Sequence, residues 1–433
     1  MPDPETAGRD RLRRLSKEGL WIVLGQTAAI IGGLVGVRLL TELMDPAAYG
    51  ELALGMTAAA LVNQVVLGPL ANGVTRFYAP AQEQHDLGGY LAATRGLVSA
   101  ATMAIVLLAL LALAGLAIAG RAQWVPITGA ALAFATLTGY NAILNGIQNA
   151  ARQRAIVALH QGIEPWARFL TAAGLLLWLG ANSALAMIGY AIAVLFVLGS
   201  QFFFYLRTIH ETISTPNQSE WRSQVWRYSW PISAFGVFTW VQLASDRWAL
   251  ELFATTREVG TFAALLQLGY YPMAMVSTMA MQFLAPIFYQ RAGDASDSRR
   301  TADVSRLSWN LTGLALGTTA AVFLLALFFH RQIFHLLVAR EYAHVSGLLP
   351  WMLLAGGIFA AGQAIALNLM SQLRTRSMMA AKIVTAILGT GLNFGLAYWL
   401  GTAGIVIAAV LFSVLYFAWM ALLLVRSPHN ALS

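Results

Sequence analysis

The chain has 433 residues, of which 58% are hydrophobic and only 11% are charged, and its formal net charge is +8. Long apolar runs recur along it, so the composition predicts an all-α integral membrane protein that crosses the membrane many times. The sequence contains no cysteine, which excludes disulfides, thiol nucleophiles and cysteine metal sites. Nearly all the cations are arginines beside apolar segments, which fits membrane topology better than binding of nucleic acid.

Twelve transmembrane helices of roughly 20 residues or more are predicted. In chain order they lie near residues 18–41, 47–75, 91–119, 125–150, 154–179, 182–206, 226–253, 258–288, 306–329, 343–371, 377–400 and 403–425. A polar, basic tail at 1–17 precedes them, and a short tail at 426–433 follows. The first apolar run is too long for a cleaved signal peptide, so we expect the N-terminal tail to be retained.

Most Lys and Arg residues fall on the side of the membrane that holds the N-terminus. The opposite side holds Arg121, Arg257, Arg331 and Arg340. Cytoplasmic loops carry an excess of Lys and Arg, so both termini are predicted to be cytoplasmic.

An internal repeat relates the two halves of the chain. The fourth helix ends in NGIQNAARQR (145–154) and the tenth in NLMSQLRTR (368–376). The second helix of each half matches as well, with YGELAL (49–54) against VGTFAA (259–264).

This repeat predicts two six-helix lobes, 18–206 and 226–425. Six crossings return the chain to its starting side, so the lobes are related by a parallel repeat. The polar segment 207–225, which contains Pro216 and Asn217, is predicted to be a cytoplasmic linker between them.

The fifth helix carries three ionisable residues in a segment bound for lipid. His160, Glu164 and Arg168 are spaced i, i+4, i+8, so a helix places them on one face. Arg168 lies roughly 20 Å into a hydrocarbon layer of about 30 Å, where a charge costs about 2.5–3.5 kcal/mol. In one interpretation Glu164 and Arg168 neutralise each other and hold the helix to a neighbour. In the other, Arg168 binds an anionic ligand in a wet cavity, and Glu164 tunes it or carries a coupling proton.

Two further arginines are predicted near the outer ends of their spans. Arg247 follows Asp246, roughly 28 Å along the seventh helix, and Arg38 lies at a similar height on the first. Either they form part of an outer vestibule that binds substrate, or their side chains reach the interface without a functional role.

Amides gather on one face of the fourth helix. Asn141, Asn145 and Gln148 are spaced i, i+4, i+7. This pattern is expected of a wall that binds sugars, and equally of hydrogen bonds between helices.

The repeated RQR and RTR motifs place arginines at cytoplasmic helix ends. These arginines are Arg152, Arg154, Arg374 and Arg376. Positive-inside topology explains them, and attraction of anionic headgroups to an entrance is the alternative.

Three stretches carry a family resemblance: DPAAYGELAL (45–54), GPLANGVTRFYA (68–79) and ASDRWALELFATTREVGTFAALLQL (244–268). They resemble the polysaccharide branch of the multidrug/oligosaccharidyl-lipid/polysaccharide (MOP) superfamily, the Wzx-type O-antigen flippases, and the helix spacing agrees over nearly the whole chain. The resemblance implies transport of an undecaprenyl-pyrophosphate oligosaccharide, the repeat unit of an O-antigen, exopolysaccharide or capsule. It also implies the bacterial inner membrane, transfer from the cytoplasmic to the periplasmic leaflet, and alternating access through a cationic cavity.

Two alternatives remain open at this point. A cation-coupled multidrug exporter of the same superfamily should hold a deep carboxylate in the N-terminal lobe, whereas Glu164 has Arg168 as a partner. A membrane glycan polymerase or ligase needs catalytic groups on a sizeable outer loop, and the longest one, about 330–342, contains no acid pair.

The sequence predicts a transporter and not an enzyme. It contains no phosphate-binding P-loop and no metal-ligand spacing, so no cofactor is expected, and coupling to a proton or sodium gradient stays an option. The expected partners are the lipid-linked glycan, membrane lipids, and a glycan polymerase with its export machinery. The chain is expected to act as a monomer.

Overall fold

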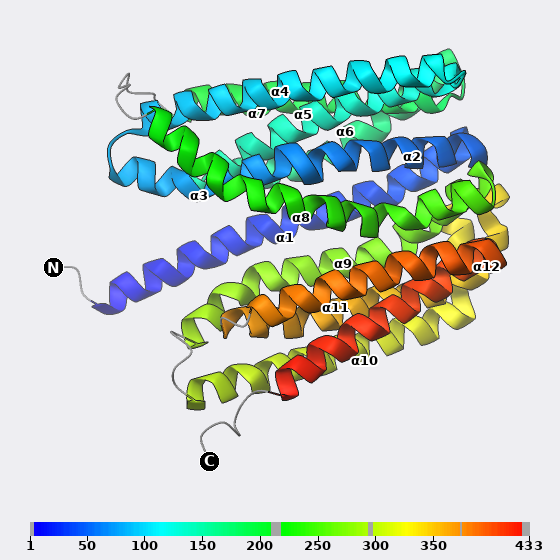
Figure 1. Cartoon of the computed structure of the whole chain (residues 1–433). Helices are drawn as coiled ribbons and strands as arrows, with labels where there is room; N and C mark the ends of the chain where they lie inside the picture. Colours follow the sequence, from blue (N-terminus) through cyan, green and yellow to red (C-terminus); the bar gives the residue numbers. More distant parts are fainter. Residues whose placement is uncertain (1–3, 209–217, 293–297, 373–374, 427–433) are drawn as a thin grey trace. The chain divides into compact units, whose positions relative to one another are not determined.

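The structure is a computed structural model, and it describes residues 4–208, 218–292, 298–372 and 375–426. These residues form helices and no strand (Figure 1). The helices are α1 (Pro4–Leu43), α2 (Pro46–Val62), α3 (Gly68–Glu83), α4 (Leu87–Ile118), α5 (Val125–Ala150), α6 (Arg154–Leu179), α7 (Ser183–Thr208), α8 (Gln218–Phe253), α9 (Thr256–Ala292), α10 (Ser298–Leu337), α11 (Leu349–Ser371) and α12 (Thr375–Val425).

Two of these helical segments depart from a simple α-helix. α2 and α3 are joined by one stretch of π-helix, Asn63–Leu67, so that they form one continuous crossing. α12 is interrupted at Gly401, whose φ of 55° and ψ of −134° are not helical. The predicted pair of helices at 377–400 and 403–425 corresponds to the two arms of α12.

Nine segments of the described chain are long and apolar enough to cross a membrane. α6 and α8 are not among them, because charged and polar side chains lower their hydropathy, and α12 is counted once although it has two arms. With these three the described chain has twelve segments of membrane-spanning length. The predicted all-α membrane fold with twelve crossings is therefore confirmed.

Several helices run beyond the apolar spans that hydropathy predicts. The bounds of α5 and α6 coincide with the prediction, whereas α1 begins at Pro4 and α8 at Gln218, inside the predicted linker. Hydropathy detects only the part of a helix that lies in lipid, and polar residues with good helix propensity extend it into water. The span predicted near 343–371 corresponds to the continuous segment Arg340–Ser371. Its first part, Arg340–Leu348, is 3₁₀-helical, and α11 follows with Pro350 in its first turn.

The chain divides into two compact units. Unit 1 consists of Met1–Met44 and Glu51–Val241, and unit 2 consists of Asp45–Gly50 and Gln242–Ser433. The first part of α8 therefore belongs to unit 1 and its end to unit 2.

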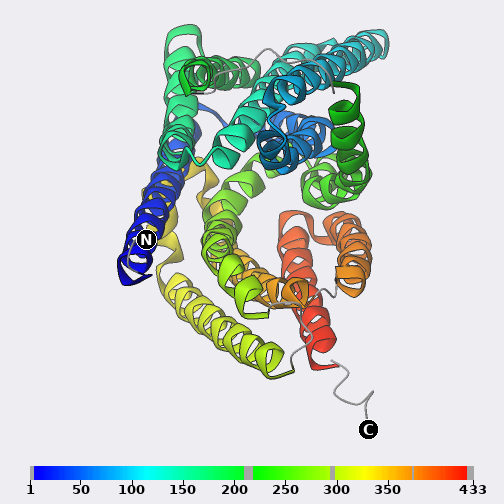
Figure 2. The same ribbon diagram turned by 90° about the vertical axis from the view of Figure 1, so that its left-hand side faces the viewer.

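Unit 1 is built on the close packing of α1 against α6 and of α5, α6 and α7 against one another (Figure 2). Glycines on α1 permit this approach, since a Cβ on Gly36 would collide with the ring of Phe169. Trp166 Nε1 also donates to the carbonyl of Ala28 at 2.9 Å. This face of α6 meets α1, and its opposite face, which carries Arg168, is left for α5 and α7.

In unit 2, α11 packs against α9, α10 and α12. The interruption of α12 is tied to α9 by Glu258, whose Oε2 accepts hydrogen bonds from the backbone nitrogen of Thr402 at 3.1 Å and from its hydroxyl at 2.9 Å. Glu258 thus caps the second arm of α12.

Candidate functional site

Arg168 lies in the middle of α6, inside unit 1. Its side chain is 20% exposed, and its Nη1 is 3.8 Å from Oε1 of Glu164, one turn earlier. Its Nε is buried and has no hydrogen-bond partner within the described residues. The ion pair expected from the spacing is present, but it is long and engages only part of the guanidinium.

Three aromatic rings surround the Arg168 guanidinium. Its central carbon lies 5.9 Å from the ring centroid of Phe134 on α5, 5.4 Å from that of Phe169 on α6 and 5.2 Å from that of Tyr190 on α7. A desolvated cation–π contact contributes about 2 kcal/mol or more. Contacts through ring faces stabilise the charge without using its in-plane N–H donors.

His160 lies on the same face of α6 but is engaged by α7. Its Nδ1 donates to the carbonyl of Ile156 at 2.7 Å, because a carbonyl oxygen can only accept. Its Nε2 lies 3.1 Å from the hydroxyl of Ser200, and its ring meets Phe204 edge-on. The buried imidazole therefore joins α6 to α7, with both ring nitrogens in use.

The predicted amide face of α5 meets a buried glutamine on α7. Gln201 Nε2 donates to Asn145 Oδ1 at 2.7 Å and to Gln148 Oε1 at 2.8 Å. Asn141 is also buried, and its Oδ1 has no partner in the described part of the chain. Asn145 and Gln148 thus make hydrogen bonds between helices. Gln201 was missed, although a single amide within the apolar helix 183–208 was a usable signal.

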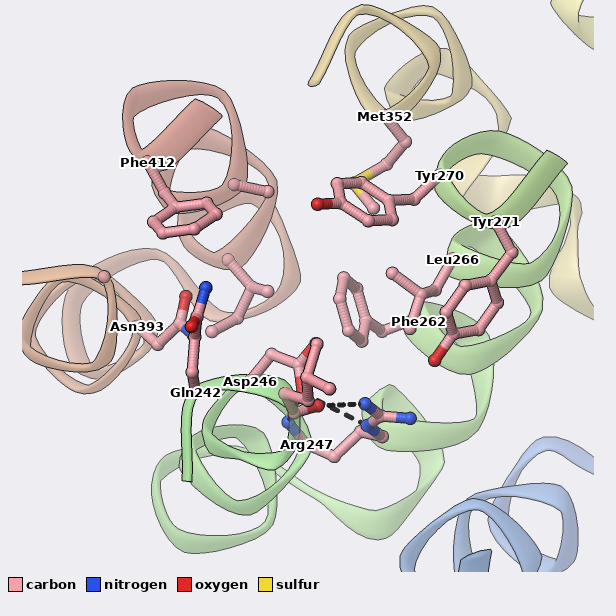
Figure 3. Close-up of a pocket in the computed structure, with 14 residues that line it drawn as sticks. Gln242, Asp246, Arg247, Phe262, Leu266, Tyr270, Tyr271, Met352, Asn393 and Phe412 are labelled. Atoms are coloured by element: carbon pink, nitrogen blue, oxygen red, sulfur yellow. Dashed lines mark hydrogen bonds and ion pairs between the residues drawn. The ribbon is translucent and has the colours of Figure 1, made fainter. Parts of the chain in front are cut away.

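Arg247 borders a cavity of about 80 Å³ inside unit 2 (Figure 3). Its Nε donates to Asp246 Oδ1 at 3.1 Å, and its Nη2 donates to the carbonyl of Leu243. The side chains of Arg247 and Asp246 are 11% and 15% exposed. The arginine is held inside the unit by its neighbouring carboxylate, and the two charges balance each other.

The remaining predicted arginines occupy more exposed positions. Arg38 pairs with Glu42 on the next turn of α1, a partner that sequence reasoning missed. Arg152 has a φ of 61° in the turn between α5 and α6, and Arg154 Nη1 donates to Asn149 Oδ1 at 3.0 Å. Arg374 and the side chain of Arg376 lie outside the described residues.

Within the described ranges, no three His, Asp or Glu residues lie close enough together to bind a metal ion.

The chain matches the family described as polysaccharide biosynthesis protein over residues 15–291. No curated protein matches it in sequence.

Several solved structures are similar to it. An inward-facing multidrug resistance MATE family transporter of the MOP superfamily has a TM-score of 0.70 and 14% identity, with 92% of this chain and 94% of that chain covered. The lipid II flippase MurJ in an inward closed conformation has a TM-score of 0.73 and 10% identity, with 95% of this chain and 87% of that chain covered. A MOP superfamily transporter from Pyrococcus furiosus, described as having a binding pocket of reverse polarity, has a TM-score of 0.58 and 13% identity, with 94% of each chain covered.

At these identities the likeness shows the fold, which is that of MOP superfamily transporters, and the family match covers most of the chain. The chain therefore belongs to the polysaccharide biosynthesis protein family and is a multi-pass membrane protein.

Proposed function

We propose that this chain flips a polyprenyl-pyrophosphate-linked oligosaccharide from the cytoplasmic to the periplasmic leaflet of the bacterial inner membrane by alternating access. The cargo would be the repeat unit of an O-antigen, exopolysaccharide or capsule. The family match and the likeness to a lipid II flippase support this class of cargo. The observation that carries the proposal is the guanidinium of Arg168 at the middle of α6.

Arg168 is suited to hold the anionic pyrophosphate. A guanidinium has five N–H donors in a planar fork, which matches phosphate oxygens bidentately. Glu164, at 3.8 Å, and three ring faces offset the cost of keeping the charge in the membrane. Donors such as the Nε, which has no partner in the described chain, remain for the ligand.

Net transport in one direction needs a driving force and partners. Consumption of the flipped glycan by a polymerase outside would supply the force, and a proton or sodium gradient is the other source. The chain would act as a monomer with both termini in the cytoplasm, and it would receive its substrate from the inner leaflet.

A cation-coupled multidrug exporter is the second candidate, and the likeness to a MATE family transporter favours it. Such a protein needs a carboxylate that can bind a cation. In unit 1 Glu164 lies 3.8 Å from Arg168, and a cationic drug or coupling ion at that position would be repelled by the guanidinium. The embedded charge therefore favours an anionic cargo.

Substitutions at Arg168 and Glu164 test the proposal, with export scored as surface glycan in a strain that lacks the native protein. Arg168→Ala is expected to reduce export by about 10- to 150-fold, because it removes a charge-assisted contact of about 1.5–3 kcal/mol. Arg168→Lys should retain part of the export, since it keeps the charge but loses the fork. Glu164→Gln should weaken export without lowering the protein level.

The control is Arg207→Ala at the end of α7, where the guanidinium stacks on Phe203 at 4.1 Å. This variant should export like the parent. Normal export by an Arg168→Ala protein that accumulates to the parent's level would contradict the site. Disappearance of that protein, together with that of Arg168→Lys, would show that the pair with Glu164 is structural.

A further inference from the structure

The cavity beside Arg247 in unit 2 is not explained by pyrophosphate binding. It lies among α8, α9, α11 and α12, and it contains polar groups from three of them (Figure 3). The polar side chains that line it are Gln242, Asp246, Arg247, Tyr270, Tyr271 and Asn393. Ionisable groups within membrane-spanning segments usually face the bundle interior or a wet cavity, and they often mark a substrate path.

The charges at the wall of this cavity disfavour an ionic ligand. Asp246 and Arg247 form an ion pair at 3.1 Å, so their charges cancel. A phosphate can only accept hydrogen bonds and would be repelled by the carboxylate, whereas a cation would be repelled by the guanidinium. The wall suits a neutral group instead.

The hydrogen-bonding groups fit a ligand whose hydroxyls both donate and accept. Asp246 offers acceptors, Arg247 offers donors, and the amide of Gln242 and the hydroxyl of Tyr270 offer both. Asn393 Nδ2 donates to Ser245 Oγ at 2.8 Å, which fixes the orientation of its amide. Several fixed polar groups around one space can orient a polyhydroxylated ring.

Aromatic rings form the apolar part of the wall. Tyr270 reaches into the cavity in Figure 3, and Phe412 lies on another side of it. Phe359 packs against both, with ring centroids 5.9 Å from Tyr270 and 5.9 Å from Phe412. Phe359 thus holds the two lining rings in place, so that they offer rigid faces to the C–H side of a sugar ring.

The cavity is large enough for a small polar ligand and reaches the surface of unit 2. Its volume of about 80 Å³ exceeds the roughly 10–15 Å³ that a single water needs. Leu243 and Tyr271 at its edge are 47% and 36% exposed. The cavity is therefore open on the side of α8 and α9, so that one group of a larger ligand could enter it while the rest stays outside.

We propose that this cavity binds one uncharged sugar residue. The proposal rests on the proposed function, because the sugar is part of the glycan cargo, and it assigns to unit 2 a recognition site separate from the phosphate contact of Arg168. The groups that recognise the sugar are Asp246, Tyr270 and Asn393.

The absence of native cysteine permits a direct test with the purified full-length chain in detergent. Gln242→Cys and Asn393→Cys place a thiol in the cavity, and N-ethylmaleimide measures its accessibility. The probes are the methyl glycosides of glucose, galactose, rhamnose and N-acetylglucosamine, with sorbitol as a polyol control. The matched control is Thr318→Cys, in an apolar cavity of about 220 Å³ lined by α9, α10 and α11.

At least one glycoside is expected to slow alkylation of Gln242→Cys about tenfold at about 10 mM, given the millimolar affinity typical of so small a ligand. Protection of Asn393→Cys should be weaker, because that variant lacks one of the groups that recognise the sugar. Sorbitol should have no effect, and alkylation of Thr318→Cys should not change. Tyr270→Phe, in the Gln242→Cys background, keeps the ring but removes the hydroxyl, so protection by the glycoside should weaken.

Three results would overturn the proposal. In the first, no glycoside protects the cavity cysteines. In the second, neither cavity cysteine is alkylated in the folded protein. In the third, sodium chloride slows alkylation more than choline chloride does, and no sugar slows it. The alkylation assay does not measure transport, so it is independent of the export test. If Arg168→Ala loses export and any of these three results is found, the sugar site is rejected and the proposed function stands. Protection together with normal export in Arg168→Ala would reject the phosphate contact instead.

Discussion

The two embedded arginines are stabilised in different ways. Arg168 has one ion pair of 3.8 Å and three ring faces, whereas Arg247 has a carboxylate at 3.1 Å and a backbone carbonyl. The first arrangement leaves the Nε donor of Arg168 without a partner in the described chain, whereas the second uses the Nε and Nη2 donors of Arg247. In the proposed function, the first arrangement would bind the phosphates of the cargo and the second would bind one of its sugars.

Arg152 offers a test of the entrance hypothesis without disturbing the fold. Its φ of 61° is a conformation that glycine adopts more readily than arginine, so Arg152→Gly removes the charge and keeps the turn. A basic residue near an anionic surface contributes about 1 kcal/mol, so export at limiting substrate should fall about fivefold. Arg152→Lys should export like the parent. Unchanged export by Arg152→Gly would mean that Arg152 serves only topology.

Sequence spacing could predict the Glu164–Arg168 pair, because i,i+4 partners share a helix face whatever the tertiary structure is. It could not predict Phe134 and Tyr190 around Arg168, or Gln201 beside Asn145, because these residues come from other helices. Contacts between helices depend on packing, which one sequence does not reveal.

At the scale of helices, the approach of α1 to α6 positions the face that carries Arg168. The contact places Phe169 against Gly36 on one side, and the same ring lies 5.4 Å from the Arg168 guanidinium. Hydropathy could predict both helices, and also the break near Gly401, where a glycine interrupts an apolar run. It could not tell that Arg340–Leu348 forms a 3₁₀ segment and not the first turns of an α-helix.

Two glycines on α1 form a matched pair for testing this packing. A Cβ atom added to Gly36 would collide with Phe169, whereas a Cβ atom added to Gly33 would have no atom of another helix within 4 Å. Gly36→Ala should lower the free energy of unfolding by about 1–3 kcal/mol through overpacking. Gly33→Ala should be neutral or stabilise by up to about 1 kcal/mol, because alanine favours helix. Thermal unfolding of the purified proteins in detergent measures both, and equal melting temperatures would contradict the packing of α1 on α6.

At the scale of the whole molecule, the chain forms two compact units, and the end of α8 lies in a different unit from its beginning. Alternating access requires that substrate sites be presented to one side of the membrane at a time. The predicted topology, with six crossings in each lobe, sets which loops face the cytoplasm and which face the periplasm.

Reporter fusions test this topology. Both termini are expected to be cytoplasmic, so a fusion after Arg222 should report the cytoplasm and one after Arg340 the periplasm. The Lys and Arg bias is the physical reason. If both fusions report the same side, an odd number of the crossings assigned between them is wrong.

Flipping in reconstituted vesicles tests directly whether the chain moves a lipid-linked glycan and whether Arg168 is needed for it. The purified chain would be placed in liposomes that contain a fluorescent polyprenyl-pyrophosphate oligosaccharide, and an added glycosidase would cleave only glycans on the outer leaflet. In vesicles with the parent protein, the enzyme should reach the inner-leaflet pool as well. In vesicles with Arg168→Ala, cleavage of that pool should be about 10- to 150-fold slower. Protection of the inner pool by the folded parent protein, or equal cleavage with Arg168→Ala, would contradict the account.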